Sequence, residues 1–435
     1  MSFVVLLVAP PPSASPARAR CEPHAMSGAS RGDGGDGGAS RAWCAACKTM
    51  VRAPLRAHEV KCPVLVRAAQ ARARAYYSKD INVVAGDGGE GVRDDGARDE
   101  GVREAKARAA AAALTAASRS RDSHGGDLLV DVPANESLDV VARECAQNAA
   151  ERRAREEELS APTQSRHDAQ FAGIVSAMRL YGLVRSGADV RASDKPLYVE
   201  FGAGRGYLSH FLSDAYGDVD LALVERRAYR HKAERSLRRR TGFIERLTID
   251  IKDLNLNAVD AVASRDVVAM AKHLCGEATD LALRACFGRG STARTNFRVR
   301  GVAFATCCHH RCAWNTYVNR EYLISLGIGR DEFEYLTKIS SWATLATNAD
   351  AETAGEHASG AVHFDASHAF DDVTDEEKLK LGRLAKRILD EGRARWCQSQ
   401  GLSATLEAFV PRTTSPENVI LLARDDAVDD RVGPP

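Results

Sequence analysis

The chain has 435 residues, a length typical of two or three domains. Its 60 lysine and arginine residues nearly balance its 59 aspartate and glutamate residues, so the net charge indicates no class of partner. No apolar run approaches the roughly 20 residues that span a bilayer, and we expect no membrane partner. The eleven cysteines are clustered, which favours metal or active-site roles in a reducing compartment, the cytoplasm or the nucleus.

The first 40 residues are rich in proline, alanine, glycine and serine and are predicted to be disordered, because they cannot bury enough apolar surface. The apolar stretch Phe3–Ala9 is short and has no basic residues before it, so it is a poor signal peptide. The alanine-, arginine- and serine-rich segment that follows leaves import into an organelle as an alternative location.

Residues 41–83 begin with a pattern of metal ligands. Cys44 and Cys47 have the spacing of a zinc knuckle, and His58 and Cys62 lie one turn apart on a helix predicted from Pro54 to Cys62. Four sulfur and nitrogen ligands suit a closed, tetrahedral Zn²⁺ site, without which so small a module would not fold. The sequence therefore predicts a structural zinc finger; the alternative is a chance grouping in a cysteine-rich terminus.

The second part of this region combines basic residues with paired aromatic ones. Arg72 and Arg74 precede Tyr76 and Tyr77, a combination suited to phosphate contacts and base stacking. An ordered linker after a solvated helix end is the alternative interpretation. Residues 84–134, rich in glycine, aspartate and arginine, are predicted to form a linker that is partly helical.

Residues 135–425 are predicted to form an α/β catalytic domain. Two helices are expected between Leu138 and Leu183, beside one edge of a sheet, and residues 346–372 are expected to be a surface insertion. The alternation of strands and helices that follows predicts a Rossmann-like, mostly parallel sheet that ends in an antiparallel pair. The expected strands are Leu197–Val199, Leu221–Val224, Leu247–Ile251, Asp266–Met270, Arg300–Ala305, Leu406–Val410 and Asn418–Leu422.

A glycine turn follows the first of these strands. Glu200 precedes Gly202, Gly204 and Gly206, and the amphipathic helix Tyr207–Tyr216 comes next. Such a turn lets a ligand approach the backbone and the free N–H groups of the helix. The spacing differs from the G-x-G-x-x-G of dinucleotide sites, and Glu200 would repel a pyrophosphate. A cationic ligand fits better, which indicates S-adenosylmethionine (SAM); a tight turn without a ligand is the alternative.

Two further carboxylates stand at the ends of predicted strands. Glu225 follows the last glycine by about 19 residues, where a carboxylate accepts hydrogen bonds from the ribose hydroxyls of an adenosine. Asp250, with Asp253 as a competitor, is a candidate for the adenine amino group. Because ligands bind at the carboxyl ends of parallel strands, these residues are expected to meet at one site.

Lys272 and His273 end the fourth strand of the predicted sheet. Either side chain could orient an attacking oxygen or accept its proton, although a structural histidine is an alternative. His309 is a third candidate for the proton acceptor.

The cluster 307–312 has three interpretations: a second zinc site, a nucleophile at Cys307 or Cys308, or a substrate-orienting group with His309 and Arg311. We favour the third, because adjacent ligands chelate a metal awkwardly.

Several motifs resemble the eukaryotic tRNA 2′-O-methyltransferase family that modifies the fourth nucleotide of the acceptor stem. They are YYSKDIN from Tyr76, EFGAGRGYLS from Glu200, IDIKDL from Ile249, KHLCGEATDLALR from Lys272, CCHHRCAW from Cys307, SSWAT from Ser340 and SPEN from Ser415. The resemblance implies a SAM site at Gly202, Gly204 and Glu225. It also implies N-terminal fingers, of which the first is eroded here, and Cys47 stands where the second would offer a histidine.

The expected activity is therefore SAM-dependent 2′-O-methylation of tRNA. The zinc finger, the tyrosine pair and a basic helix predicted over Arg226–Arg240 are expected to hold the acceptor stem by its shape and phosphates. No DNA partner is expected, and the sequence does not indicate an oligomeric state. The alternatives are a pyrimidine base methyltransferase with a cysteine nucleophile, or a zinc- and RNA-binding scaffold without activity.

Overall fold

The computed structural model describes residues 41–52, 55–83, 100–119, 132, 136–155, 165–184, 195–229, 237, 242–288, 295–344, 370 and 373–427. The chain divides into two compact units, Met1–Val66 and Arg67–Pro435. The segment 1–40, nearly all of the insertion 346–372 and most of the basic helix expected over Arg226–Arg240 lie outside the described residues.

The first unit contains a small antiparallel hairpin and a short helix. Strands β1 (Arg41–Cys44) and β2 (Thr49–Arg52) pair, and helix α1 (Leu55–Glu59) follows. The single helix expected up to Cys62 is wrong, because α1 ends at Glu59 and Cys62 lies in the turn before α2 (Pro63–Arg72). A proline at position 63 disfavours helical backbone at the preceding residue, and this explains the break.

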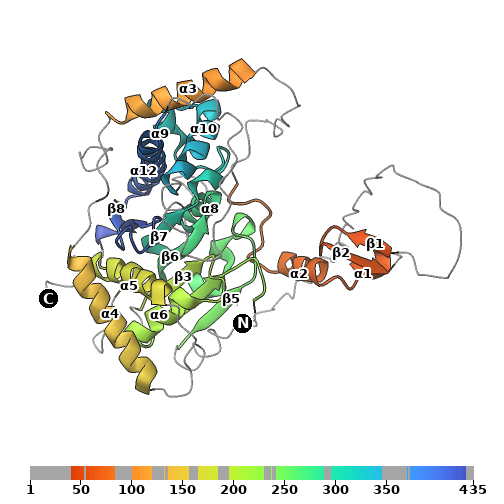
Figure 1. Ribbon diagram of the computed structural model, residues 1–435. Helices are drawn as coiled ribbons and strands as arrows, with labels where there is room; N and C mark the ends of the chain where they lie inside the picture. Colours follow the sequence, from red (N-terminus) through yellow and green to blue (C-terminus); the bar gives the residue numbers. More distant parts are fainter. Residues whose placement is uncertain are drawn as a thin grey trace, which may run out of the picture. The chain divides into compact units, whose positions relative to one another are not determined.

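The second unit is built on a seven-stranded sheet with the order β5-β4-β3-β6-β7-β9-β8 (Figure 1). The first five strands of this order are parallel, and β9 is antiparallel to both of its neighbours. The expected α/β fold with a mostly parallel sheet and an antiparallel closing pair is confirmed. The strands are β3 (Leu197–Phe201), β4 (Asp220–Val224), β5 (Ile244–Leu247), β6 (Asp266–Cys275), β7 (Arg298–Cys307), β8 (Ser403–Ala408) and β9 (Val419–Arg424).

The strand expected over Leu247–Ile251 is wrong in its bounds. Strand β5 ends at Leu247, where its pairing with β4 stops. The side chain of Asp250 accepts a hydrogen bond from the backbone N–H of Lys252 and starts the 3-10 helix η2 (Ile251–Asp253). A capping aspartate thus turns the chain where the apolar pattern alone suggested that a strand continues.

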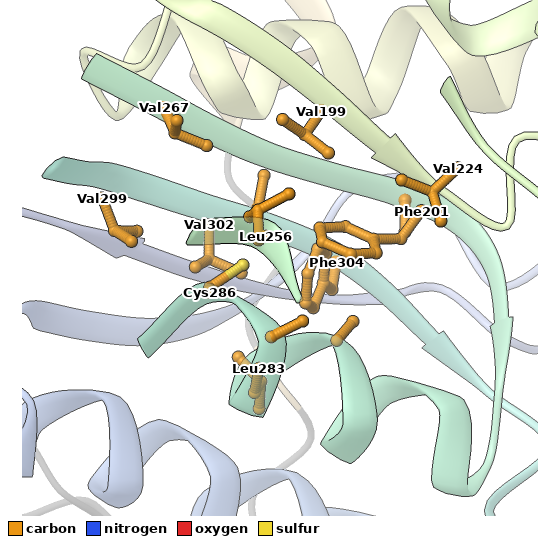
Figure 2. Close-up of a cluster of buried hydrophobic side chains, with 14 of the residues drawn as sticks. Val199, Phe201, Val224, Leu256, Val267, Leu283, Cys286, Val299, Val302 and Phe304 are labelled. Atoms are coloured by element: carbon orange, nitrogen blue, oxygen red, sulfur yellow. The ribbon is translucent and has the colours of Figure 1, made fainter. Parts of the chain in front are cut away.

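Side chains of β3 alternate between the two faces of the sheet. Leu197, Val199 and Phe201 belong to a cluster with α8 (Glu277–Phe287) and the C-terminal half of α12 (Asp375–Ser399) (Figure 2). Tyr198 belongs to the opposite cluster. There, α4 (Glu136–Arg155), α5 (Ser165–Leu180) and α6 (Tyr207–Tyr216) pack together. The two helices expected beside a sheet edge therefore form part of the layer over one face.

A third apolar cluster joins α3 (Glu100–Ala117), α9 (Arg320–Ser325), α10 (Arg330–Ser340) and α12. In α3, which lies within the expected linker, Ala107, Ala110, Leu114 and Ala117 recur every three or four residues and are buried. Within the described residues, every helix is too short or too polar to traverse a bilayer. The remaining 3-10 helices are η3 (Leu256–Ala258), η4 (Asp260–Val262), η5 (His309–Arg311) and η6 (Ser341–Thr344).

Candidate functional site

A cleft of about 930 Å³ opens at the carboxyl ends of β3, β4 and β6. The chain runs from β3 to β4 in one direction along the sheet and returns to β6 on the other side, so the cleft lies where the strand order reverses. This is the usual ligand position in open α/β sheets. Eight residues singled out in the sequence line the cleft: Glu200, Gly202, Gly204, Glu225, Asp250, Lys272, His273 and Arg311.

The three glycines of the turn have different roles. All three have positive φ angles: 64° at Gly202, 51° at Gly204 and 78° at Gly206. A Cβ atom on Gly204 would meet no atom within 4 Å, so this residue borders open space in the cleft. A Cβ atom on Gly206 would lie 2.7 Å from a methyl group of Leu223, so this glycine permits close packing on β4 instead.

Glu225 is fixed against the glycine turn. One carboxylate oxygen accepts a hydrogen bond from the N–H of Gly204 at 3.0 Å, and the other accepts from the N–H of Arg227 at 2.9 Å. Each oxygen keeps a second lone pair, so the group can still accept hydrogen bonds from a ligand. Asp250 lies 4.0 Å from the guanidinium of Arg226 and forms the far end of the cleft.

Glu200 is buried beneath the turn and holds the first turn of α6. Its carboxylate accepts hydrogen bonds from the N–H of Ser209, at 3.1 Å, and from the Ser209 hydroxyl. Burial raises the pKa of Glu200 to about 7, although these hydrogen bonds favour the charged form. Its negative charge is therefore sensitive to pH near neutrality.

Lys272 and His273 form one wall of the cleft together with residues that the motifs did not indicate. The Lys272 ammonium lies 3.0 Å from Nδ1 of His167 and 3.9 Å from the ring centre of Phe171, both on α5. The side chain of His273 is exposed, yet desolvation by the surrounding atoms, and next the charge of Lys272, lower its pKa to about 4. The imidazole is therefore neutral at pH 7.

The segment from Tyr76 to Asn82 is pinned to the loop after Asp250. The Asn82 amide donates to the carbonyls of Ile251 and Leu254 at 2.7 and 2.8 Å, and Lys252 forms an ion pair with Asp80 at 3.1 Å. Tyr76 and Tyr77 are half-buried against the core. These contacts hold the loop that carries Asp250.

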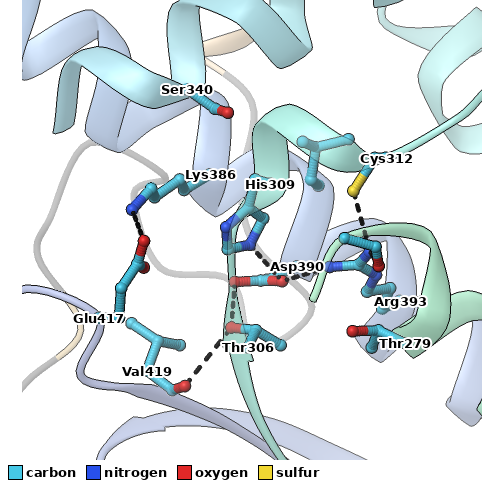
Figure 3. A network of polar contacts seen from close by, with 12 residues as sticks. Thr279, Thr306, His309, Cys312, Ser340, Lys386, Asp390, Arg393, Glu417 and Val419 are labelled. Atoms are coloured by element: carbon cyan, nitrogen blue, oxygen red, sulfur yellow. Dashed lines mark hydrogen bonds and ion pairs between the residues drawn. The ribbon is translucent and has the colours of Figure 1, made fainter. Parts of the chain in front are cut away.

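His309 does not line this cleft. It is buried, and its Nε2 lies 2.9 Å from Asp390, a residue of α12 (Figure 3). With Thr306 and Asp390 it lines a second cleft of about 430 Å³. Among the described residues, the Nδ1 atom of His309 has no hydrogen-bond partner.

Arg393 connects the second cleft to the core. This fully buried guanidinium contacts Asp390 at 3.0 Å (Figure 3). It also contacts Asp280 at 2.7 Å and donates to the carbonyl of Gly276. Burial raises the pKa of Asp390, but the interactions with His309, and after them the charge of Arg393 and the hydrogen bond from Thr306, outweigh burial and lower the pKa to about 2. Sequence reasoning missed this network because α12 carries many charges and only its packing shows which of them are buried.

Cys307 and Cys308 meet a cysteine that the sequence did not indicate. The sulfur of Cys275, at the end of β6, lies 3.6 Å from that of Cys307, at the end of β7. Cys275 lines the larger cleft, as does Arg311, whereas Cys307 is buried.

The four predicted zinc ligands of the first unit come together. The sulfurs of Cys44 and Cys62 are 3.9 Å apart, and that of Cys47 lies 3.4 Å from Nε2 of His58. Tetrahedral zinc, with bonds of about 2.3 Å to sulfur and 2.0–2.1 Å to nitrogen, separates its ligand atoms by about 3.5–3.8 Å. The set therefore fits a structural Zn²⁺ ion.

The mostly parallel sheet and the cleft at its strand-order reversal place the chain in the class of Rossmann-like α/β proteins. Residues 170–424 match the family model described as Methyltransferase TRM13, and the chain belongs to this family. It is 34% identical to the tRNA:m(4)X modification enzyme TRM13 homologs of Mus musculus, over 283 residues, and Homo sapiens, over 285 residues. A Kluyveromyces lactis tRNA:m(4)X modification enzyme TRM13 is 32% identical over 253 residues.

These alignments cover 52% of this chain, 59% of the mouse and human proteins and 55% of the yeast protein. The chain thus spans less than two thirds of the length of these curated relatives.

Proposed function

We propose that the chain transfers a methyl group from SAM to a ribose 2′-oxygen of tRNA, at the fourth nucleotide of the acceptor stem. The observation that carries this proposal is the larger cleft, in which the glycine turn and the carboxylates Glu225 and Asp250 share one lining with Lys272 and His273. Membership of the TRM13 methyltransferase family supports methyl transfer, and the names of the relatives support a tRNA substrate. None of the ten cysteines among the described residues forms a disulfide, which supports a reducing compartment, the cytoplasm or nucleus.

The donor would be held mainly by charge and shape. Glu225 is placed to accept hydrogen bonds from its ribose hydroxyls, and Asp250 from its adenine amino group. Gly204 leaves space for the donor beside the backbone, and Glu200 contributes a negative charge beneath it. When bound, SAM supplies an electrophilic methyl group.

Lys272 and His273 would bind the substrate hydroxyl and accept its proton. His273 is neutral at pH 7, so a ring nitrogen can accept the proton that the ribose hydroxyl loses. Lys272, held by His167 and Phe171, is placed to donate a hydrogen bond to the attacking oxygen. A positioned base typically contributes about 10²–10⁴ in rate.

Donor affinity is expected to increase with pH between 6 and 8. The Glu200 carboxyl, with a pKa of about 7, changes from mostly neutral to mostly charged over this range, and a cationic ligand binds the charged form more tightly. Calorimetric titration of the full chain with SAM should show a gain of up to about tenfold. Glu200→Gln should flatten the profile, since His273 stays neutral throughout. A variant profile as steep as the wild type would contradict this role.

The second cleft supports a polyanionic substrate. Its lining contains five cationic side chains and two carboxylates, an excess of three positive charges among the described residues; the cations are Lys380, Arg383, Lys386, Arg387 and Arg412. It lies where β7 ends and β9 begins, at the same edge of the sheet as the donor cleft. RNA phosphates at this place would set the register of the stem, as phosphate contacts do in other complexes.

The double substitution Lys380→Glu and Arg412→Glu reverses two positive charges of the second cleft. It is expected to weaken tRNA binding about tenfold or more at 0.15 M salt, because phosphate contacts dominate such affinities. The slope of log K against log salt should fall by about two. Arg108→Glu, an exposed reversal on α3, is the control and should change neither quantity. An equal loss in the control would show that the effect is one of net charge alone.

The position of the methyl group in the product distinguishes ribose methylation from base methylation. Purified chain, tRNA and methyl-labelled SAM are incubated, and the tRNA is digested with a nuclease that needs a free 2′-hydroxyl. The expected product is a single uncleaved dinucleotide, containing nucleotide four, that carries the label on its ribose. Label on a base, or a labelled site that is still cleaved, would refute ribose methylation and favour a base methyltransferase. If the chain did not bind SAM, the remaining interpretation would be a zinc- and RNA-binding scaffold without activity.

A further inference from the structure

Three cysteine sulfurs gather at the wall of the larger cleft. Strands β6 and β7 are paired so that Cys275 lies opposite Cys307, and Cys308 follows directly. The ligand atoms of the three residues all lie within 4.8 Å of one another. Cys275 and Cys308 are half-buried and Cys307 is buried.

We propose that Cys275, Cys307 and Cys308 bind a second zinc ion through three thiolates. The adjacent pair alone would chelate a metal awkwardly, but Cys275 on the neighbouring strand adds a ligand that the cluster 307–312 lacks. Two sulfurs on one tetrahedral zinc ion lie about 3.8 Å apart, since each bond is about 2.3 Å long. The distance of 3.6 Å between Cys275 and Cys307 fits this separation, as does the 3.9 Å between Cys44 and Cys62 in the finger. A ligand set of thiolates alone selects zinc over magnesium or calcium.

The backbone conformation that brings the three sulfurs together is energetically unfavourable at Cys308. Cys308 has a φ angle of 51°, in the left-handed region that residues other than glycine rarely adopt. Gly276 approaches the following loop so closely that a Cβ atom would lie 2.5 Å from the carbonyl carbon of Arg311. The Gly276 N–H also donates to the carbonyl of Cys307 at 3.1 Å. The turn after β6 and the loop after β7 are therefore held in one arrangement.

An ion at this place would have an open coordination position. Cys275 and Arg311 line the cleft, whereas Cys307 closes the site from the core side. Zinc with three protein ligands keeps its fourth position for water or a ligand, unlike the closed set of four in the finger. The ion would also fix the end of β6, three residues beyond Lys272, and so the wall that carries Lys272 and His273.

Metal analysis of the full chain tests the proposal without recourse to activity. The wild type should contain about two zinc ions per chain, and Cys275→Ala and Cys44→Ala should each contain about one. Cys397→Ala removes a thiol that is buried in the core on α12, and it should keep two. Because loss of metal could follow from unfolding, the circular dichroism of each variant is compared with that of the wild type.

A second measurement reports the ligands of each ion by absorption spectroscopy. Cobalt substituted for zinc should give charge-transfer absorption from thiolates for two sites, and Cys275→Ala should remove the contribution of the three-thiolate site. One zinc ion per wild-type chain, lost in Cys44→Ala, would overturn the proposal. Iron or copper at the three cysteines, or two zinc ions retained by a folded Cys275→Ala, would overturn it as well.

Discussion

Gly204→Val is expected to reduce donor affinity by more than about 100-fold and to remove methyl transfer. The φ angle of 51° at this position is costly for a β-branched residue, by about 1–2 kcal/mol. The larger effect is steric, because the new side chain would project into the open space beside the Glu225 carboxylate, where the donor is proposed to bind. Calorimetry with SAM measures the affinity directly.

Gly401→Val provides a matched control for this variant. Gly401 also has a positive φ angle, 89°, and a Cβ atom there would likewise meet no atom within 4 Å. It lies between α12 and β8 and does not line the cleft. This control should have a similar backbone penalty and full donor affinity. If both variants lost affinity equally, or if Gly204→Val kept it, the donor would not lie at the glycine turn.

The parallel sheet and the cleft were predictable because local patterns encode both. Apolar strands alternate with amphipathic helices, and a parallel sheet brings the residue after each strand to one edge. Glu225 directly follows β4, whereas Glu200 and Lys272 lie near the carboxyl ends of β3 and β6. Asp250 lies three residues beyond β5, and all four residues line one cleft. Zinc-ligand spacing likewise encodes the finger, because its ligands are local: even with the helix before Cys62 wrongly extended, the four side chains converge.

The missed residues depend on contacts between distant segments. His167 reaches Lys272 across 105 positions, and Cys275 meets Cys307 across 32. Nothing in the local sequence marks these pairs, since each residue alone resembles an ordinary helix or strand position. His309 stands in an unusual motif, yet Asp390, 81 residues later, fixes its ring at the second cleft. Pairings of this kind follow from strand order and helix docking, which the sequence pattern does not specify.

Arg393→Met is expected to destabilise the second unit by about 3–5 kcal/mol, because removing one partner of a buried ion pair leaves uncompensated charge. The guanidinium is fully buried between Asp280 and Asp390, and methionine would leave both carboxylates in the core without it. Urea denaturation, followed by circular dichroism, measures the loss. Lys380→Met on the same helix removes only an exposed pair with Glu376 and should leave the free energy of unfolding nearly unchanged.

The pH dependence of the Arg393→Met variant tests the cause of this loss. In the wild type, the pKa of Asp390 is about 2, so its stabilising contribution is present above the unfolded value and is lost only as the pH falls toward 2. Without the guanidinium, buried carboxylates have raised pKa values, and the folded state then binds more protons than the unfolded state. The difference in stability from the wild type should therefore shrink as the pH falls from 8 to 5. A difference that stays constant over this range would indicate lost packing instead of unpaired charge.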